Sequence, residues 1–236
     1  MNLASLRDLA HRAVHAYDPP PGTFPLKDRL GQNRGFMTSN TDSVTIAVRG
    51  TSTLKDALID ADLAQKHTRE GFVHKGFWTE YLSIAEEIGR FMAAFPGKVV
   101  RVAGHSMGGA IATYVAEHAA SLGRDVELVT LGSPRAGDHD FANLFNRHCI
   151  DGVRIVHAYD IVPRVPKLWY RHVEGLLHID RKGGEIKDTR GFFGELLYAG
   201  KVALADLTRK ALDDHSSMAY LCALEDYIKT AKGGNP

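Results

Sequence analysis

One short segment of the chain holds a serine in a pattern suited to nucleophilic catalysis. Gly104-His105-Ser106-Met107-Gly108 fits G-x-S-x-G. An apolar strand is expected directly before it, at 99–103, and a helix directly after it, at 107–122. A serine at such a sharp strand-to-helix turn holds strained backbone angles, and its hydroxyl stands clear of the sheet at the positive end of the helix. We therefore predict that Ser106 is a nucleophile, the alternative being a chance glycine-rich turn.

A nucleophilic serine needs a histidine to take its proton and a carboxylate to orient that histidine. Where this turn occurs, the acid follows the serine along the chain and the histidine comes last. Three histidines come late enough, namely His172, His178 and His215. The first two lie in a segment patterned like a β-hairpin, where a structural role is favoured. His215 stands at a helix start in a polar stretch, so we predict it as the base, with a plain capping-region residue as the alternative.

The carboxylate is best supplied by Asp160. It follows the strand expected at 153–158, and the loop past the carboxyl end of a strand is where ligands bind in such sheets. Two prolines within 161–166 stiffen this loop by fixing φ. Asp138 and Asp140 follow the preceding strand by a longer stretch and are more easily explained as helix-start residues.

The elements that must position these residues alternate between strand and helix. This alternation implies an α/β fold with a mostly parallel central sheet and helices on both faces. We expect a single domain over 1–236, with 1–34 an N-terminal helical extension packed on it and without a feature tied to chemistry. The expected helices are 3–17, 76–95, 107–122, 140–148, 192–212 and 215–230; the expected strands are 35–38, 43–48, 99–103, 126–131 and 153–158, with a hairpin over 169–186.

Composition and charge exclude several classes of protein. With 29 Lys and Arg against 28 Asp and Glu, the net charge is +1, so neither a nucleic-acid binder nor a polybasic membrane attachment is indicated. No apolar run approaches the ~18–20 residues that span a bilayer, so no stable membrane insertion is expected. The charged first residues do not fit a signal peptide, which favours a cytoplasmic protein, or a secreted one whose leader was removed or whose route needs no signal.

Neither a metal nor a cofactor is expected. The sequence has no Glu-flanked histidine pair, no Cys-x-x-Cys, no phosphate loop and no dinucleotide fingerprint. Cys149 and Cys222 are too few for a disulfide framework and are expected to be buried thiols. Of the other histidines, His74 is expected to make a structural hydrogen bond and His105 to pack beside the nucleophile.

From about residue 35 to the end, the chain resembles the class 3 lipase family, the fungal-lipase-like branch of the α/β-hydrolases. Any one of its motifs is weak evidence, but together and in order they are specific. They are Val48-Arg49-Gly50-Thr51, Val73-His74-Lys75-Gly76-Phe77, Gly104-His105-Ser106-Met107-Gly108-Gly109-Ala110, Leu131-Gly132-Ser133-Pro134-Arg135-Ala136-Gly137-Asp138 and Asp160-Ile161-Val162-Pro163-Arg164-Val165-Pro166.

The resemblance implies an α/β-hydrolase fold and a role for each matching position. Ser106 would be the nucleophile, Asp160 the acid and His215 the base. The backbone amides of Thr51 and Met107 would form the oxyanion hole, where preorganised donors are worth ~10²–10³ in rate each. The alternative for Thr51 is a turn hydroxyl that caps the next helix.

The function expected from this resemblance is that of a serine carboxylester hydrolase of the triacylglycerol lipase or carboxylesterase type. It would cleave lipid-like acyl esters, at an oil–water interface, through a covalent acyl-enzyme. Phospholipase A1 and feruloyl-type esterase activities remain alternatives, as does a non-catalytic binding module. Residues 52–63 are expected to form an amphipathic lid or a fixed surface helix, and 192–199 to wall an acyl groove or pack in the core.

Overall fold

A computed structural model describes residues 1–50, 64–148, 150–186 and 213–233 of the chain. The expected lid at 52–63 and the expected helix at 192–212, with its apolar run at 192–199, lie outside the described residues. So do Thr51 and Cys149.

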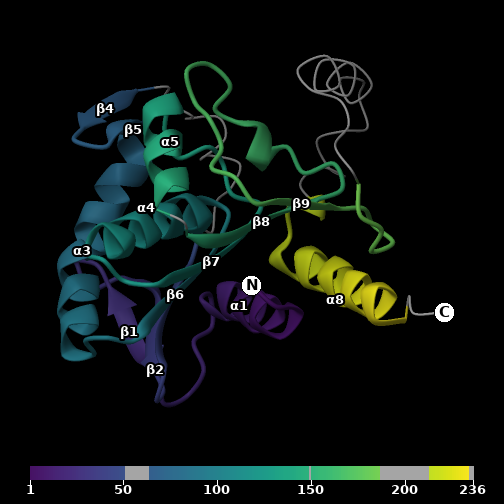
Figure 1. Cartoon of the computed structure of the whole chain (residues 1–236), viewed down its shortest axis with the longest axis horizontal. Coiled ribbons are helices and arrows are strands. Elements are labelled where there is room, and N and C mark those ends of the chain that lie inside the picture. The colour runs from purple at the N-terminus through teal and green to yellow at the C-terminus, as the bar shows by residue number, and fades with distance from the viewer. Residues whose placement is uncertain (51–63, 149, 187–212, 234–236) are drawn as a thin grey trace.

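The centre of the molecule is one mixed sheet in the order β1-β2-β3-β6-β7-β8-β9 (Figure 1). The five strands from β3 to β9 are parallel to one another, while β1 and β2 add antiparallel strands at one edge. The predicted fold class, a mostly parallel sheet flanked by helices, is therefore confirmed. The strands are β1 Phe24–Lys27, β2 Asn33–Ser39, β3 Ser43–Val48, β6 Val99–His105, β7 Val126–Leu131, β8 Asp151–His157 and β9 Leu176–Ile179.

Helices cover both faces of this sheet, and the central strands supply both cores (Figure 1). Helices α3 (Lys75–Ala94), α4 (Met107–Ser121) and α5 (His139–Arg147) pack on one face, and α1 (Leu3–His15) and α8 (Ser217–Gly233) on the other. Successive side chains of a strand point to opposite faces, so β6 gives Val102 to one core and Ala103 to the other.

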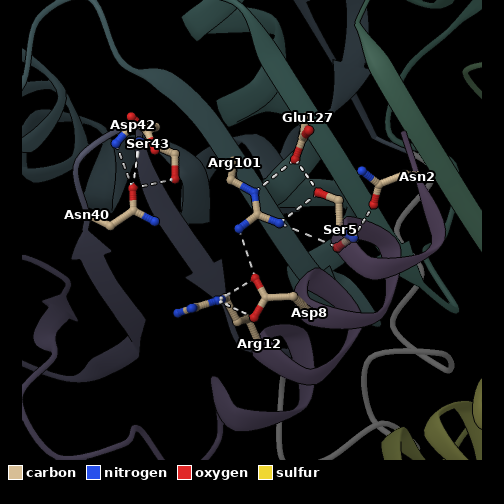
Figure 2. Close-up of polar contacts among 9 residues, drawn as sticks. All are labelled: Asn2, Ser5, Asp8, Arg12, Asn40, Asp42, Ser43, Arg101 and Glu127. Atoms are coloured by element: carbon tan, nitrogen blue, oxygen red, sulfur yellow. Dashed lines mark hydrogen bonds and ion pairs between the residues drawn. The ribbon is translucent and has the colours of Figure 1, made fainter.

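The first helix is fixed to the sheet by a polar cluster (Figure 2). The Arg101 guanidinium, near the start of β6, contacts Asp8 and Glu127, each at 2.9 Å, and donates to the Ser5 hydroxyl at 2.8 Å. These contacts place the start of α1 at the amino end of β6. Because α1 also packs along β6, its end reaches toward the opposite, carboxyl edge of the sheet.

The structure differs from the sequence-based expectations at several elements. The expected hairpin over 169–186 is found only around its turn, where Ile179 and Glu185 form an antiparallel bridge and the Ile186 amide donates to the His178 carbonyl at 2.8 Å. The longer arm contributes only β9, which pairs parallel with β8 and was not expected to enter the central sheet. The chain after β8 crosses back before it enters the sheet, which an apolar pattern alone does not reveal. Strand β1 and the small sheet of β4 (Gln65–Thr68) and β5 (Gly71–His74) were not expected.

Two further findings concern the cysteines and membranes. Cys222 is an exposed free thiol, so the expectation that it is buried is wrong. It lies on α8, one residue after the buried Leu221, on the side of the helix turned away from the sheet. Among the described residues, no helix combines the length and the apolar character that crossing a membrane requires.

Candidate active site

Ser106 occupies the turn between β6 and α4. Its backbone angles, φ 58° and ψ −134°, are strained for a residue with a side chain. The turn needs a glycine before it, because a Cβ on Gly104 would lie 2.2 Å from the carbonyl oxygen of Gly108. Ser106 is the N-cap residue of α4, yet its side chain makes no capping hydrogen bond. The hydroxyl is therefore not used to satisfy the helix, and it stands where the helix dipole favours negative charge.

Asp160 and His215 form a buried pair. The Nδ1 atom of His215 lies 2.7 Å from Oδ2 of Asp160, and the two residues are 3% and 0% exposed. The same Oδ2 accepts a hydrogen bond from the Tyr220 hydroxyl at 2.6 Å, and Oδ1 accepts one from the Val162 amide at 2.9 Å. Gly132 closes over the pair: a Cβ there would lie 2.8 Å from Oδ2 and 3.0 Å from the imidazole. Three donors thus fix the carboxylate in one orientation.

The loop that holds His215 is anchored through its neighbour Asp214. This buried carboxylate accepts two hydrogen bonds from the Arg181 guanidinium, both at 2.9 Å, and one from the Tyr159 amide at 3.1 Å. Such a bidentate pair fixes orientation as well as distance. The backbone oxygen of Asp214 also lies 3.0 Å from Nδ1 of His157. From the sequence, Asp214 is only part of a polar stretch, whereas the structure makes it the residue that positions the histidine loop.

The second ring nitrogen of His215 is the chemically interesting one. A carboxylate can only accept a hydrogen bond. Nδ1 therefore carries the proton and donates to Asp160, and Nε2 is the acceptor nitrogen. Nε2 is buried and makes no hydrogen bond to any described residue. The ring lies against that of His105, the residue before Ser106, with 4.7 Å between the centroids. An oriented, unpaired basic nitrogen next to the serine turn is the arrangement that a general base needs.

Tyr17, just past the end of α1, reaches this site although nothing in the sequence pointed to it. Its hydroxyl accepts a hydrogen bond from the Gly50 amide at 3.1 Å and lies 2.8 Å from Nδ1 of His105. Nε2 of His105 in turn lies 2.8 Å from the carbonyl oxygen of His215. Since that carbonyl can only accept, Nε2 carries the proton and Nδ1 accepts from the tyrosine. A continuous chain of hydrogen bonds therefore joins the residue before Thr51 to His215.

The sequence suggested only that His105 packs beside the nucleophile. In the structure it also links Tyr17 to the backbone of His215. Burial, and next the neighbouring His215, lower the pKa of His105 from 6.5 to about 3, so its ring is neutral at ordinary pH. A neutral ring is what both of its hydrogen bonds require, because Nδ1 must keep its lone pair for Tyr17.

The alternative candidates make structural contacts. Nε2 of His172 bonds to the Pro163 carbonyl, and Nε2 of His178 lies 3.0 Å from the carbonyl oxygen of Ala158. Asp138 caps α5 by accepting from the Phe141 amide at 2.9 Å, and the side chain of Asp140 is exposed to solvent. His74 caps α3, with its Nδ1 3.3 Å from the Phe77 nitrogen.

Of the two expected oxyanion donors, the structure describes one. Met107 is the first residue of α4, where backbone amides have no partner within the helix. Thr51 lies outside the described residues, but its predecessor Gly50 lies against the serine, since a Cβ on Gly50 would come within 3.0 Å of the Ser106 Cβ.

No metal centre is evident in the part of the chain that the structure describes. His11 and His15 on α1 stand at the i, i+4 spacing that zinc pairs use. The described residues nevertheless contain no group of three His, Cys, Asp or Glu that could hold an ion. Nε2 of His11 is instead paired with Glu225 of α8 at 2.9 Å.

Comparisons with known proteins agree in one family. Residues 45–169 match the family model of the class 3 lipases. The chain is 30% identical over 177 residues to the secreted mono- and diacylglycerol lipase 1 of Fusarium solani, covering 68% of this chain and 53% of that protein. It is 28% identical over 149 residues to a chloroplastic phospholipase A1 of Arabidopsis thaliana, covering 52% and 33%.

The solved structures give the same fold. The crystal structure of the lipase from Rhizopus microsporus var. chinensis superposes with a TM-score of 0.64 at 24% identity, covering 75% of this chain and 74% of that one. At that identity the likeness concerns the fold, which is that of the α/β-hydrolases. This chain spans about half the length of the curated relatives it matches first.

Proposed function

Because the chain belongs to the class 3 lipase family, we propose that it is a serine carboxylester hydrolase that cleaves lipid-like acyl esters. The observation that carries the proposal is the buried pair of His215 and Asp160. Nε2 of His215 has no partner among the described residues, and its ring lies against that of His105, the residue before Ser106. The fold alone does not imply an activity, since hydrolase folds also serve as binding modules. A binding module would have no need of a buried, oriented and unpaired imidazole nitrogen.

The reaction follows from the geometry. Nε2 of His215 takes the hydroxyl proton of Ser106 as its oxygen attacks the ester carbonyl, and the developing imidazolium is stabilised by Asp160. The negative charge on the carbonyl oxygen is met by the amide of Met107 and by that of Thr51. His215 then gives its proton to the leaving alcohol as the C–O bond breaks, which leaves an acyl-serine. Water attacks the acyl-serine with the same proton transfers and releases the acid.

The three donors to Asp160 support its role as the orienting acid. Tyr220 binds the same oxygen, Oδ2, as the histidine, and the Val162 amide binds Oδ1. Charge-assisted hydrogen bonds of this kind are shorter and about twice as strong as neutral ones. The imidazole is thereby kept in one tautomer, with Nε2 as its acceptor nitrogen.

The substrate class is supported by the relatives and by the composition. The Fusarium protein is named as a mono- and diacylglycerol lipase, so glycerides are the first candidate substrates. The Arabidopsis protein is named as a phospholipase A1, so phospholipids are the second. A net charge of +1 suits an enzyme that meets uncharged esters without electrostatic steering. The name of the Fusarium protein also favours secretion over a cytoplasmic location, which fractionation of producing cells would decide.

The decisive test is Ser106→Ala. We expect turnover of a p-nitrophenyl ester to fall by ~10⁴ or more, because the three residues act as a unit. Ser121→Ala, at the other end of α4, is the matched control and should keep full activity. Undiminished turnover in Ser106→Ala would reject the proposal.

A panel of esters of graded acyl length, with a triglyceride, a phospholipid and a feruloyl ester beside them, then settles the substrate class. The proposal expects the highest kcat/KM on glycerides. A preference for phospholipid would select the second candidate, and a preference for feruloyl esters the third.

A further inference from the structure

The connection between β8 and β9 carries large apolar side chains on the surface beside the acid. Leu168 is 60% exposed and Trp169 is 77% exposed. Tyr159 and Ile161, on either side of Asp160, are also exposed. In Figure 1 this connection includes the green loop that rises beside α5 at the top of the view. The catalytic acid and an apolar tip therefore belong to one segment of the chain.

This tip is held on a firm base. Before it, the Arg135 amide donates to the Val165 carbonyl at 2.9 Å, and the Arg135 guanidinium donates to the carbonyl of Pro166 at 3.0 Å. After it, Tyr170 is buried, and the Arg171 amide donates to the Gly137 carbonyl at 2.8 Å. The exposure of Leu168 and Trp169 is thus a feature of an anchored turn, since both of its sides are tied to the loop after β7.

The backbone at the tip turns Trp169 outward at a conformational cost. Its φ is 66°, in the left-handed region that bulky residues avoid. The indole gains little inside the protein in return, because most of its surface stays in water. Strained residues of this kind cluster where a ligand or partner binds. The strain at Trp169 is therefore expected to be compensated by binding to a partner outside the chain.

Charges on both sides of the tip indicate the chemistry of that partner. Lys167 precedes the apolar pair and Arg171 follows it, and both side chains are exposed. Residues 167–171 contain no acid. Tryptophan favours the boundary between headgroups and acyl chains, and neighbouring cations attract anionic headgroups.

We propose that residues 167–171 dock the enzyme on anionic phospholipid surfaces. A protein partner is disfavoured because a stable protein interface buries about 1,200 Å² or more, which two side chains do not provide. A bilayer needs no such area, since a tryptophan and a leucine enter it singly. That docking brings the enzyme to its substrate rests on the proposed function, but the test of docking does not depend on turnover.

The first experiment uses the Ser106→Ala protein, which leaves the vesicles intact. The chain has two tryptophans, and Trp78 is half-buried against Tyr114, so a change in emission reports on Trp169. With mixed phosphatidylcholine–phosphatidylglycerol vesicles we expect a blue shift, which Trp169→Phe in the same background removes. Because each cation near an anionic surface adds to the attraction, binding to pure phosphatidylcholine should be about tenfold weaker. No shift, or an unchanged shift in the Trp169→Phe protein, overturns the proposal.

The second experiment measures co-sedimentation with the mixed vesicles. Leu168→Ser with Trp169→Ser should lower binding at least tenfold. The matched control is Leu122→Ser, which removes a leucine of the same exposure, 61%, at the far end of α4. Equal binding by the double variant and its parent, or an equal loss in Leu122→Ser, contradicts the assignment.

The same double variant, made with Ser106 intact, separates docking from chemistry. It should hydrolyse a soluble short-chain p-nitrophenyl ester at the parental rate, which also shows that it folds. Loss of that activity would overturn the view that the tip acts only in docking. If the parent protein binds vesicles but hydrolyses no ester, the proposed function fails while the docking proposal stands.

Discussion

Helix α1 takes part in two polar networks of opposite character, one along the helix and one just past its end. In its first half, Asp8 pairs with Arg101, which also pairs with Glu127, in a cluster of charges that is partly open to solvent (Figure 2). Just past its end, the half-buried Tyr17 contacts His105 in a chain of uncharged groups that continues, fully buried, to the backbone of His215. One helix therefore joins a surface ion-pair cluster to the candidate active site.

The two networks differ in whether their groups are charged, which follows from how burial and neighbouring charges shift the pKa values. Burial would raise the pKa of Asp8, but the hydrogen bonds and charges of Arg12 and Arg101 outweigh it and lower the pKa. Water screens such pairs, so they contribute little to stability. Burial raises the pKa of Tyr17 and lowers that of His105, so both groups of this network are neutral, and an unpaired polar group there is costly. We infer that the charged cluster orients the helix, whereas the neutral chain fixes the geometry of the site.

The largest effect is expected at the buried site itself. Asp160→Asn keeps the size of the side chain and should keep the fold, but it removes the charge that orients His215 and stabilises its protonated form. We expect kcat to fall by ~10³–10⁴. Steady-state kinetics on a soluble ester, with circular dichroism as the check on folding, measures this. A rate like that of the parent protein would move the acid elsewhere.

The next effect is a loss of stability in acid that comes from His105. Its pKa is about 3 in the folded protein and 6.5 when free, so below pH 6.5 the unfolded chain binds a proton that the folded chain does not. Stability from this group is complete above pH 6.5 and is lost as the pH falls toward 3, by about 2 kcal/mol at pH 5.

The matching measurement compares urea unfolding of the parent protein and of His105→Gln between pH 7 and pH 5. The variant lacks the titrating ring, so the stability advantage of the parent should shrink as the pH falls. Other histidines are present in both proteins and cancel. Two curves that stay parallel would show that His105 keeps an ordinary pKa.

Local patterns explain what could be predicted from the sequence. The parallel sheet, its flanking helices and the family were read correctly, because strand–helix alternation and the glycines around Ser106 are visible within short windows. Asp160 and His215 were proposed from their place after a strand and before a helix, and the structure puts them 2.7 Å apart. Their roles in the reaction remain a prediction.

Contacts between distant segments explain what could not be predicted. Tyr17 is 88 residues from His105, and nothing near it in the sequence shows that α1 runs along β6 toward the serine turn. The same limit applies to β9, whose alternation fits either a hairpin or a parallel strand. The one signal near Tyr17 is its place at the end of an amphipathic helix before a run of prolines. That pattern predicts a helix end but not the contact with His105.

Tyr17→Phe tests the neutral network with a smaller expected effect. The variant keeps the ring but leaves the Gly50 amide and Nδ1 of His105 without their partner. One such hydrogen bond is worth about 0.5–1.5 kcal/mol, so we expect kcat to fall about three- to tenfold. KM should stay constant, because the hydroxyl is used within the protein. A change in KM alone would instead indicate that Tyr17 contacts the substrate.

The smallest effect is expected in the charged cluster of the same helix. Asp8→Asn removes a charge that Arg101 and Arg12 share, and we expect a loss of stability of at most about 1 kcal/mol, as is usual for exposed pairs. At an ionic strength of about 1 M the loss should fade, because salt screens exposed charges over ~3 Å. The kcat of Asp8→Asn should equal that of the parent protein, since the contacts of Tyr17 lie at the far end of α1. A fall in kcat as large as that of Tyr17→Phe would mean that the charged cluster also sets the geometry of the site, and the division between the two networks would then be abandoned.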